Sequence, residues 1–451
     1  MTTQLRDHET TTTTTAATRT ANLPRRRPAI RNAAATQAAA RVVATQLLRL
    51  IDVGGLSIQE QRRLRTFGAG EPRATLVVRS PRFWPALLRG SAGLAEAYAQ
   101  GWFESPDLVD LIRIGALNAG KLDAPRRALA PILAPLQRGR ELIRPPKLNR
   151  ARREIAAHYD LGNELFEAML DPTLSYSSAL FANTSMTLEQ AQLAKLERIC
   201  ERLELRSGDH LLELGAGWGA LAAYAAETRG CRVTTTTISA EQHSYATELI
   251  RRRGLSKLVT VLDRDYQELE GRYDKLVSVE MIEAVGWRNL DRYFAKCSEL
   301  LTPEGLMMLQ AITIDDRAYQ VEKASSSFIN TYIFPGGSLP SLSALTAAMA
   351  RRSDLQLVGL EDLTASYVET LRRWRANFNA AAASLERHGF DARFRRLWDL
   401  YLAYSEAGFT ERRIQDVQLL FAKPGHRFSL SAVDGPPTAC SPDRANSAVR
   451  P

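Results

Sequence analysis

Hydrophobic and polar residues alternate along most of the chain in patterns that predict strands and helices in turn. Between Ile155 and Lys423, five short hydrophobic runs have the length of buried strands, and helical stretches separate most of them. These predicted strands are His210–Leu214, Arg232–Ile238, Leu258–Leu262, Lys275–Glu280 and Leu306–Ile314. Such alternation predicts an α/β fold with a parallel, doubly wound sheet. Ahead of the first strand, Thr187 and Gln190 have the spacing of a capping box, which predicts a helix that begins there.

The other segments predict additional regions around this fold. The first residues are of low complexity, with a run of threonines and the triplet Arg25-Arg26-Arg27, and predict a disordered tail. No continuous apolar run follows the arginines, so we expect this tail to have no targeting role. The predicted organisation is a tail over 1–42, a small amino-terminal domain over 43–137, a basic linker over 138–154, the α/β domain over 155–425 and a loose tail over 426–451.

Composition and charge narrow the classes of protein. Of 451 residues, 45% are hydrophobic and 24% charged, which excludes collagen-like, wholly disordered and coiled-coil proteins. No apolar run approaches the ~18 residues of a membrane-spanning helix. The net charge of +9 favours polyanions or anionic membrane surfaces as partners. Nucleic acid is not expected, because the basic linker lacks interleaved aromatic residues and no nucleic-acid-binding motif is present.

The basic linker leaves two interpretations open. It contains seven basic residues and one acid, Glu141. Such a segment is either a solvated connection or a contact with the phosphates of anionic lipids, to which each basic side chain contributes ~1 kcal/mol.

Three alternating glycines, Gly215, Gly217 and Gly219, follow the first predicted strand and precede a predicted helix. Glycines at this place allow the backbone to turn sharply and to approach a ligand at the carboxyl end of the strand. The spacing differs from that of dinucleotide-binding folds and of P-loops. Together with Glu213, two residues ahead, it is the pattern of S-adenosylmethionine-dependent methyltransferases. We therefore expect Glu213, the three glycines and Trp218 to bind this cofactor.

The next two strands end in further candidate cofactor ligands. The second strand ends in hydroxyl groups, including Thr237 and Ser239, followed by Gln242, which can bond the ribose or the methionine part. The third is followed by Asp265, which can accept the adenine amino hydrogens, and by Tyr266, which either flanks the base or packs as a half-buried ring.

Several further motifs resemble those of one family. They are His158-Tyr159-Asp160-Leu161-Gly162-Asn163, Tyr176-Ser177-Ser178, Ser278 to Gly286, Tyr332 to Gly337, Ser366 to Leu371 and Tyr401 to Phe409. Together they resemble the cyclopropane-fatty-acyl-phospholipid synthases, a family that includes the mycolic acid cyclopropane synthases. The resemblance covers roughly Val43 to Lys423.

The resemblance implies a class I methyltransferase fold and transfer of a methyl group from S-adenosylmethionine to a cis double bond of a phospholipid acyl chain. It also implies Tyr176 and Ser177 as cofactor ligands, and a cytoplasmic enzyme peripheral to the inner face of the membrane. The product is then a cyclopropane fatty acid. The oligomeric state stays open, with a homodimer as one alternative.

The resemblance also implies how the proton is removed after methyl transfer. The base is a bound bicarbonate, held in this chain around Glu283, Ile312 and Tyr367. The carbocation that precedes proton loss can be stabilised by aromatic faces. Suitable rings, each of which can instead simply pack in the core, are Phe166, Tyr176, Tyr332, Phe334 and Tyr401.

Three residues depart from the family pattern. Ser178 stands where a cysteine near the anion is common, Gln310 where a histidine on the fifth strand is common, and Ser405 where a cysteine near the carboxyl end is usual. Each substitute can hydrogen-bond, but none titrates near neutral pH. Two outcomes follow: the anion site survives with altered affinity, or a proton leaves a different carbon and gives a methylene or methyl-branched, tuberculostearic-type chain.

Other interpretations stay open at this point. His158 is an alternative base, although a role in orienting the loop over the cofactor is the better interpretation. The alternatives to a lipid C-methyltransferase are an N- or O-methyltransferase of a soluble small molecule and a lipid-binding protein that has lost the chemistry. No metal site is expected, and the four cysteines (Cys200, Cys231, Cys297 and Cys440) lack the spacing of a zinc site and any neighbouring pattern of a reactive thiol.

Overall fold

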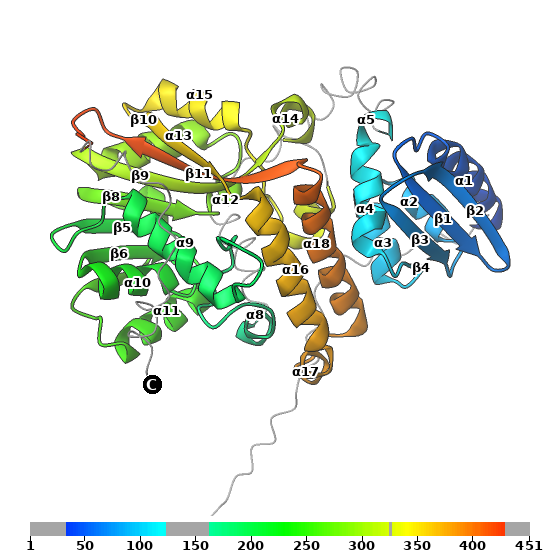
Figure 1. Ribbon diagram of the computed structural model, residues 1–451, viewed down its shortest axis with the longest axis horizontal. Coiled ribbons are helices and arrows are strands. Elements are labelled where there is room, and N and C mark those ends of the chain that lie inside the picture. The colour runs from blue at the N-terminus through cyan, green and yellow to red at the C-terminus, as the bar shows by residue number, and fades with distance from the viewer. Residues whose placement is uncertain (1–32, 123–161, 324–326, 429–451) are drawn as a thin grey trace, which may run out of the picture.

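The computed structural model describes residues 33–122, 162–323 and 327–428, and within them the chain forms two β-sheets flanked by helices. Helices α16 (Thr364–Ala380) and α18 (Ala392–Thr410) lie between the two sheets (Figure 1). The amino-terminal elements are α1 (Ala33–Leu48), β1 (Gly54–Glu60), β2 (Arg63–Ala69), β3 (Arg73–Val78), α2 (Phe83–Leu87), α3 (Ser91–Ala99), β4 (Phe103–Glu104), α4 (Leu108–Leu117) and α5 (Ala119–Leu122).

The remaining elements build the larger sheet and its helices. They are α8 (Asn163–Met169), α9 (Leu188–Arg202), β5 (His210–Leu214), α10 (Ala220–Arg229), β6 (Arg232–Thr237), α11 (Ala240–Arg252), β7 (Val259–Asp263), η1 (Tyr266–Glu268), β8 (Tyr273–Val279), α12 (Ile282–Val285), α13 (Leu290–Leu300), β9 (Leu301–Ile314), α14 (Asp316–Glu322), η2 (Ile329–Ile333), α15 (Leu342–Arg352), β10 (Gln356–Asp362), α17 (Ala382–Arg387) and β11 (Ile414–Ala422). The predicted capping box of Thr187 and Gln190 is present at the start of α9.

The larger sheet has seven strands in the order β10-β11-β9-β8-β5-β6-β7. The five predicted strands are confirmed as β5 to β9, and they pair in parallel. The sheet is not parallel throughout, because β11, which was not among the predicted strands, runs antiparallel to both β9 and β10. The chain reaches β11 directly from α18 and enters the sheet between these two strands, so the sheet is mixed.

Neighbouring residues of β5 show why helices cover both faces of this sheet. Leu211 belongs to a core with α9, α10 and α11, whereas Leu212 belongs to a core with α13 and α15. Successive side chains of a strand point to opposite faces, so a central strand that is apolar at consecutive positions needs a helical layer on each side. The doubly wound arrangement is thereby confirmed.

The amino-terminal part contains a four-stranded sheet in the order β2-β1-β3-β4. The strand predicted at Ala74–Val78 is confirmed as β3. The predicted disordered tail over 1–42 is wrong for residues 33–42, because these residues belong to α1, which begins at Ala33. Alanine has the highest helix propensity, and Ala40 and Ala44 are buried in the core, so this alanine-rich segment forms a packed helix.

Helix α18 joins the amino-terminal part to the larger sheet. The Arg396 guanidinium donates to the carbonyl oxygens of Tyr98 (2.6 Å) and Phe103 (2.9 Å), and the Tyr98 hydroxyl donates to Asp399 (3.1 Å). At the other end of the helix, Arg113 pairs with Glu411 at 2.6 Å. The amino-terminal part therefore packs against the helix that carries Tyr401 and Ser405.

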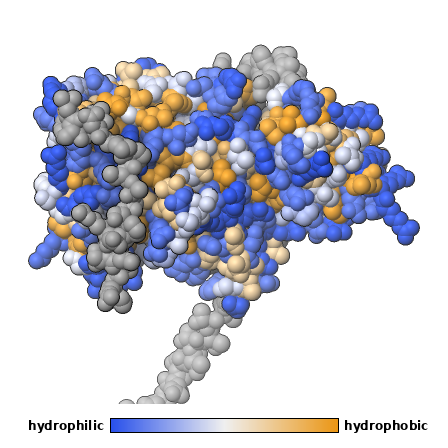
Figure 2. Space-filling model, in the orientation of Figure 1, coloured by the Kyte–Doolittle hydropathy of each residue, from blue (hydrophilic) through white to orange (hydrophobic). Residues whose placement is uncertain are grey.

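Hydrophilic residues cover much of the face shown in Figure 2, with hydrophobic residues in scattered groups. Exposed hydrophobic side chains include Leu357, Val358 and Leu360 on the edge strand β10. Among the described helices, none combines the length and the apolar character needed to cross a bilayer. The basic linker and most of both predicted tails lie outside the described residues.

Candidate active site

The glycine turn lies at the carboxyl end of β5 and leads into α10. Gly215, Gly217 and Gly219 have φ angles of +95°, +51° and +91°, which L side chains rarely adopt. The backbone N–H groups of Gly215 and Ala216 donate to the Thr236 carbonyl at 3.0 and 2.8 Å, so β6 fixes the turn. A Cβ atom at Gly217 would meet no described atom within 4 Å. The turn is therefore rigid and open on the Gly217 side, as an approaching adenosyl cofactor requires.

The candidate ligands that follow β6 bind one another in the structure. The Thr237 hydroxyl donates to Gln242 Oε1 at 2.9 Å, and Ser239 Oγ accepts from the backbone N–H of Gln242 at 3.3 Å as the N-cap of α11. Ser239 thus positions Gln242 through the first turn of the helix. The group lies one strand away from the glycine turn, where a ribose or a methionine moiety can reach it.

After β7, Asp265 and Tyr266 form a short turn. Asp265 caps it by accepting from the backbone N–H of Gln267 at 3.0 Å, and the Tyr266 ring packs edge-on against Tyr293 at 5.6 Å. Burial raises the pKa of Tyr266, so its hydroxyl stays protonated. Both residues lie at the same edge of the sheet as the glycine turn, where the adenine was expected.

A buried lysine that the sequence analysis missed lies beneath this edge. Lys195 of α9 is 1% exposed, and its Nζ donates to Ser177 Oγ at 2.6 Å. Burial lowers the pKa of Lys195 to about 8, although the carboxylates of Glu280 and Asp171 oppose the shift. Burial raises the pKa of Glu213 in β5 to about 8, and Lys195 opposes that shift. Ser177 is therefore hydrogen-bonded to Lys195, and Glu213 interacts electrostatically with Lys195.

A second missed residue, Glu280, occupies the centre of the site just after β8. Its Oε1 accepts from the backbone N–H of Ser178 and from the Gln310 side-chain amide, both at 2.8 Å. Its Oε2 accepts from the Tyr367 hydroxyl at 2.7 Å. Three of the predicted catalytic residues thus converge on one carboxylate that the prediction did not include.

Two more carboxyl groups border Glu280. Glu283 Oε1 accepts from the backbone N–H of Ile312 at 2.6 Å, and Asp416 Oδ2 accepts from the Gln310 amide at 2.9 Å. Burial and the charge of Glu280 raise the pKa of Glu283 to about 8 and raise that of Asp416 well above its usual range. The predicted pair of Glu283 and Ile312 is therefore brought together beside Glu280.

Aromatic rings extend from the glycine turn to Tyr367. Trp218 lies 4.7 Å from Phe166, which lies 5.3 Å from Tyr176. Trp374 connects Tyr176, at 5.4 Å, to Tyr367, at 6.1 Å. We call these five rings the aromatic row.

The other candidate rings lie beside the aromatic row or apart from it. The hydroxyl groups of Tyr176 and Tyr401 are hydrogen-bonded at 2.8 Å, and Phe334 lies 6.0 Å from Tyr401. Tyr332 packs instead against Phe328. Ser405 lies one turn after Tyr401 on α18, and none of the hydrogen bonds of the Glu280 network involves its hydroxyl. The structure therefore places Tyr401 and Phe334 beside the aromatic row. Ser405 lies on the same helix as Tyr401, but it takes no part in the Glu280 hydrogen bonds.

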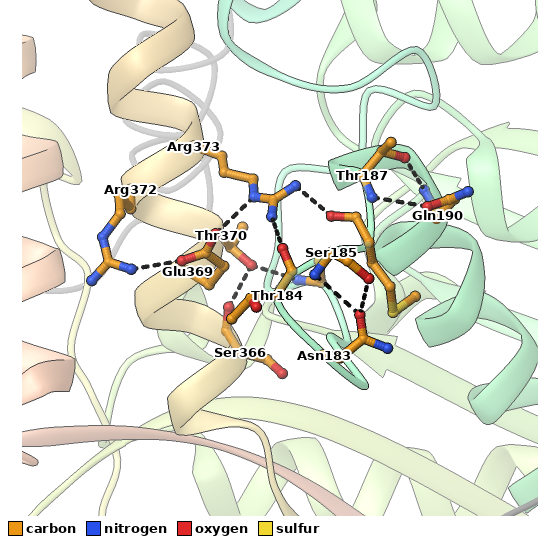
Figure 3. Close-up of polar contacts among 12 residues, drawn as sticks. Asn183, Thr184, Ser185, Thr187, Gln190, Ser366, Glu369, Thr370, Arg372 and Arg373 are labelled. Atoms are coloured by element: carbon orange, nitrogen blue, oxygen red, sulfur yellow. Dashed lines mark hydrogen bonds and ion pairs between the residues drawn. The ribbon is translucent and has the colours of Figure 1, made fainter. Parts of the chain in front are cut away.

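Helix α16 holds the loop that carries Tyr176, Ser177 and Ser178. The Arg373 guanidinium donates to the carbonyl oxygens of Met186 (2.6 Å) and Thr184 (3.1 Å) (Figure 3). Glu369 orients Arg373 at 2.9 Å, whereas Arg372 points away from the loop (Figure 3) and pairs with Glu369 (2.7 Å) and with Glu406 of α18 (3.7 Å). Thr370 also accepts from the backbone N–H of Ala179 at 3.1 Å.

The sequence contained signals for both missed residues. Lys195 follows Leu188 by seven positions and precedes Ile199 by four, so it lies on the apolar face of α9, where a lysine is unusual. Glu280 directly follows a buried strand beside the glycine turn, the position at which α/β folds hold functional groups. His158, the alternative base, lies outside the described residues.

Three cysteines have the inert character that was predicted. Cys200, Cys231 and Cys297 are buried and free, and burial raises their pKa values to about 12, 11 and 12. Their thiols therefore stay protonated at neutral pH. Cys440 lies outside the described residues.

The strand order, the glycine turn and the residues at the ends of β6 and β7 define a methyltransferase of the class I, S-adenosylmethionine-dependent type. Residues 146–419 match the family model described as mycolic acid cyclopropane synthetase. The chain therefore belongs to the mycolic acid cyclopropane synthetase family, as its motifs predicted.

Individual relatives agree with this assignment. The tuberculostearic acid methyltransferase of Mycobacterium tuberculosis is 36% identical over 424 residues, which cover 90% of this chain and 95% of that protein. The cyclopropane-fatty-acyl-phospholipid synthase of Escherichia coli is 37% identical, covering 78% of this chain and 89% of that one. A mycolic acid cyclopropane synthase solved with SAH and CTAB superimposes with a TM-score of 0.57 at 28% identity, covering 60% of this chain and 98% of that one. The protein is thus a methyltransferase of the cyclopropane fatty acid synthase type.

Gly217→Asp is expected to abolish binding of S-adenosylmethionine. The new side chain would fill the open side of the turn and would be strained at a φ of +51°. Isothermal titration calorimetry measures the affinity, and Gly208→Asp, in an exposed loop before β5, is the control that should bind normally. Unchanged affinity in Gly217→Asp would refute the assignment of this turn.

Arg373→Ala is expected to lower the free energy of unfolding by about 1–3 kcal/mol, because two carbonyl oxygens lose a charged donor. The adjacent Arg372→Ala, which removes two ion pairs of a largely exposed guanidinium, should lower it by less, at most about 1 kcal/mol. Urea unfolding of the two variants measures the difference. Equal effects would show that Arg373 does not hold the loop.

Glu283→Gln is expected to change how stability depends on pH. The folded pKa of about 8 lies above the usual 4.5, so the folded state binds the extra proton and stability falls as pH rises from about 5 to 8. One such group contributes at most about 1.4 kcal/mol per pH unit, and glutamine, which keeps an acceptor for Ile312, removes this contribution. Unfolding curves of the wild type and the variant at several pH values should therefore diverge across this window. Parallel curves would contradict the shift.

Proposed function

We propose that the protein transfers a methyl group from S-adenosylmethionine to the cis double bond of an unsaturated phospholipid acyl chain, and that a cyclopropane fatty acid forms. The observation that carries this proposal is a buried carboxylate cluster beside the glycine turn and the aromatic row. An alkene is a weak nucleophile, so it must be aligned with the methyl donor where water is excluded. After methyl transfer, aromatic rings can stabilise the carbocation, and a carboxylate beside them can accept the proton that is lost.

Each group has a physical role in this reaction. S-adenosylmethionine supplies the methyl group from its positively charged sulfonium when bound. The aromatic row presents apolar faces that accommodate an acyl chain and stabilise a cationic carbon. The carboxyl groups that follow β8 (Glu280 and Glu283) and the one in β11 (Asp416) can accept a proton, and negative charge on them favours a cationic cofactor.

We further propose that the enzyme acts in the cytoplasm, at the inner face of the membrane. The net charge of +9 and the basic segment 138–154 favour contact with anionic lipid headgroups. The printed name of the Escherichia coli relative, a fatty-acyl-phospholipid synthase, supports a phospholipid as the substrate. An acyl chain then enters the site from the bilayer without crossing water.

A second product is favoured by one comparison. The tuberculostearic acid methyltransferase matches 90% of this chain, including the amino-terminal part. The same methyl transfer followed by a different proton loss gives a methylene branch instead of a ring. Conversion of that branch to a methyl group needs a reductant from elsewhere.

Methylation of phospholipid tests the proposal directly. Purified protein is incubated with vesicles of dioleoyl phosphatidylglycerol and S-adenosylmethionine that carries a trideuterated methyl group. Mass spectrometry of the released fatty acids, with authentic ring and methylene standards, should show an added carbon that has lost one deuteron. Transfer to soluble amines without labelled lipid would overturn the proposal, as would vesicle binding without any release of S-adenosylhomocysteine.

Glu283→Ala is expected to lower kcat about 100-fold while the affinity for S-adenosylmethionine is unchanged, because the Ile312 N–H loses its acceptor and the neighbouring carboxylates shift. Glu299→Ala, at an exposed side chain of α13, is the matched control. Turnover of Glu283→Ala equal to that of the control would remove Glu283 from the site.

A further inference from the structure

Glu280 adopts a backbone conformation that favours glycine. Its φ is +48°, in the left-handed region that residues with a Cβ atom rarely adopt, and its carboxylate accepts three hydrogen bonds. Strained residues of this kind cluster at functional sites, where the surrounding contacts hold them in place. The strain here aims a carboxylate into the catalytic cluster.

The donors around Glu280 include residues that the family resemblance relates to bicarbonate. Tyr367 was expected to hold that anion, Ser178 stands where a cysteine near the anion is common, and Gln310 stands where a histidine is common. All three now donate to the Glu280 carboxylate, at 2.7–2.8 Å. The remaining expected donor, the Ile312 N–H, donates to Glu283. Bicarbonate therefore does not fit this site, because the chain's own carboxylates occupy its donors.

We propose that the Glu280 carboxylate replaces bicarbonate as the catalytic base. This inference rests on the proposed methyl transfer to an alkene. After the methyl group has joined one alkene carbon, a C–H bond of that methyl group breaks and the proton moves to Glu280. The electron pair of the C–H bond closes the ring on the cationic carbon, or forms the methylene double bond after a hydride shift. Glu280 then releases the proton to solvent.

Glu280 is close to the reacting groups. Ser278 of β8 pairs with Leu214 of β5, so Glu280 emerges beside the glycine turn. The next residue, Met281, lies 3.4 Å from the position that a Cβ atom of Gly215 would take. A carboxylate has about four lone-pair sites; Oε1 accepts two hydrogen bonds and Oε2 one, so Oε2 retains a site for a proton.

Among the three neighbouring carboxyl groups, Glu280 is the best placed to hold the negative charge. It accepts three side-chain or backbone hydrogen bonds, whereas Glu283 and Asp416 each accept one from these groups. Hydrogen bonds to the charged form favour ionisation, and the charge on Glu280 in turn raises the pKa values of the other two. Burial raises the pKa of Glu280 itself, which increases its basicity, while the nearby Lys195 opposes this.

The test uses Glu280→Gln, which keeps the shape but removes the charge, and Glu280→Gly, which also empties the donor cradle and suits the local φ. Glu204→Gly is the matched control, since Glu204 has a φ of +51° at the end of α9 and lies outside the site. Turnover on vesicles is measured in CO2-depleted buffer and after addition of bicarbonate. Calorimetry measures the affinities for S-adenosylmethionine and for bicarbonate.

The wild type and Glu204→Gly should be active without bicarbonate and should not bind it. Glu280→Gln and Glu280→Gly should lose about 100-fold or more in turnover and keep their affinity for S-adenosylmethionine. Added bicarbonate should restore at least about tenfold in Glu280→Gly alone, and only this variant should bind it.

Two results would overturn the proposal: a wild type that needs or binds bicarbonate, or a Glu280→Gly variant that keeps its turnover in CO2-depleted buffer. A wild type without activity on lipid would instead refute the proposed function. In that case bicarbonate binding still decides the inference, because binding to the wild type contradicts it and binding to Glu280→Gly alone supports it.

Discussion

Negative charge buried beside a single lysine is the constraint on which the site depends. Glu213, Glu280, Glu283 and Asp416 surround the carboxyl ends of the central strands, and the buried Lys195 interacts with Glu213, Glu280 and Asp416. Buried charge is costly unless hydrogen bonds and opposite charges compensate for it. All four carboxyl groups therefore have raised pKa values, and negative charge among them favours a cationic cofactor.

The fold explains how these groups meet. Parallel β5 and β8 end side by side, so the glycine turn and Glu280 share one edge of the sheet. Antiparallel β11 places Asp416 opposite Ile312 of β9, and α16 adds Tyr367 from the other side of the cluster. Arg373 fixes the loop of Ser178 to the same helix. A left-handed Glu280, which costs of order 1–3 kcal/mol, is maintained by these surrounding contacts.

The sequence predicted the parts that depend on local pattern. The five strands from β5 to β9, the glycine turn and the helix after it follow from hydrophobic runs and glycine spacing. Strands β10 and β11 were not predicted, and the antiparallel pairing of β11 could not be, because pairing between distant segments leaves no local signal. Tyr367, Gln310 and Ser178 were chosen through family resemblance, but their common partner Glu280 was not, because that resemblance places a free anion there. Only the packed structure shows which acceptor the donors reach.

A crystal structure of the protein with S-adenosylhomocysteine, grown with bicarbonate present, tests the central claim most directly. We predict electron density in which the Glu280 carboxylate accepts from Ser178, Gln310 and Tyr367, with no separate anion among these donors. A planar anion bound there, with the Glu280 side chain turned away, would contradict the account.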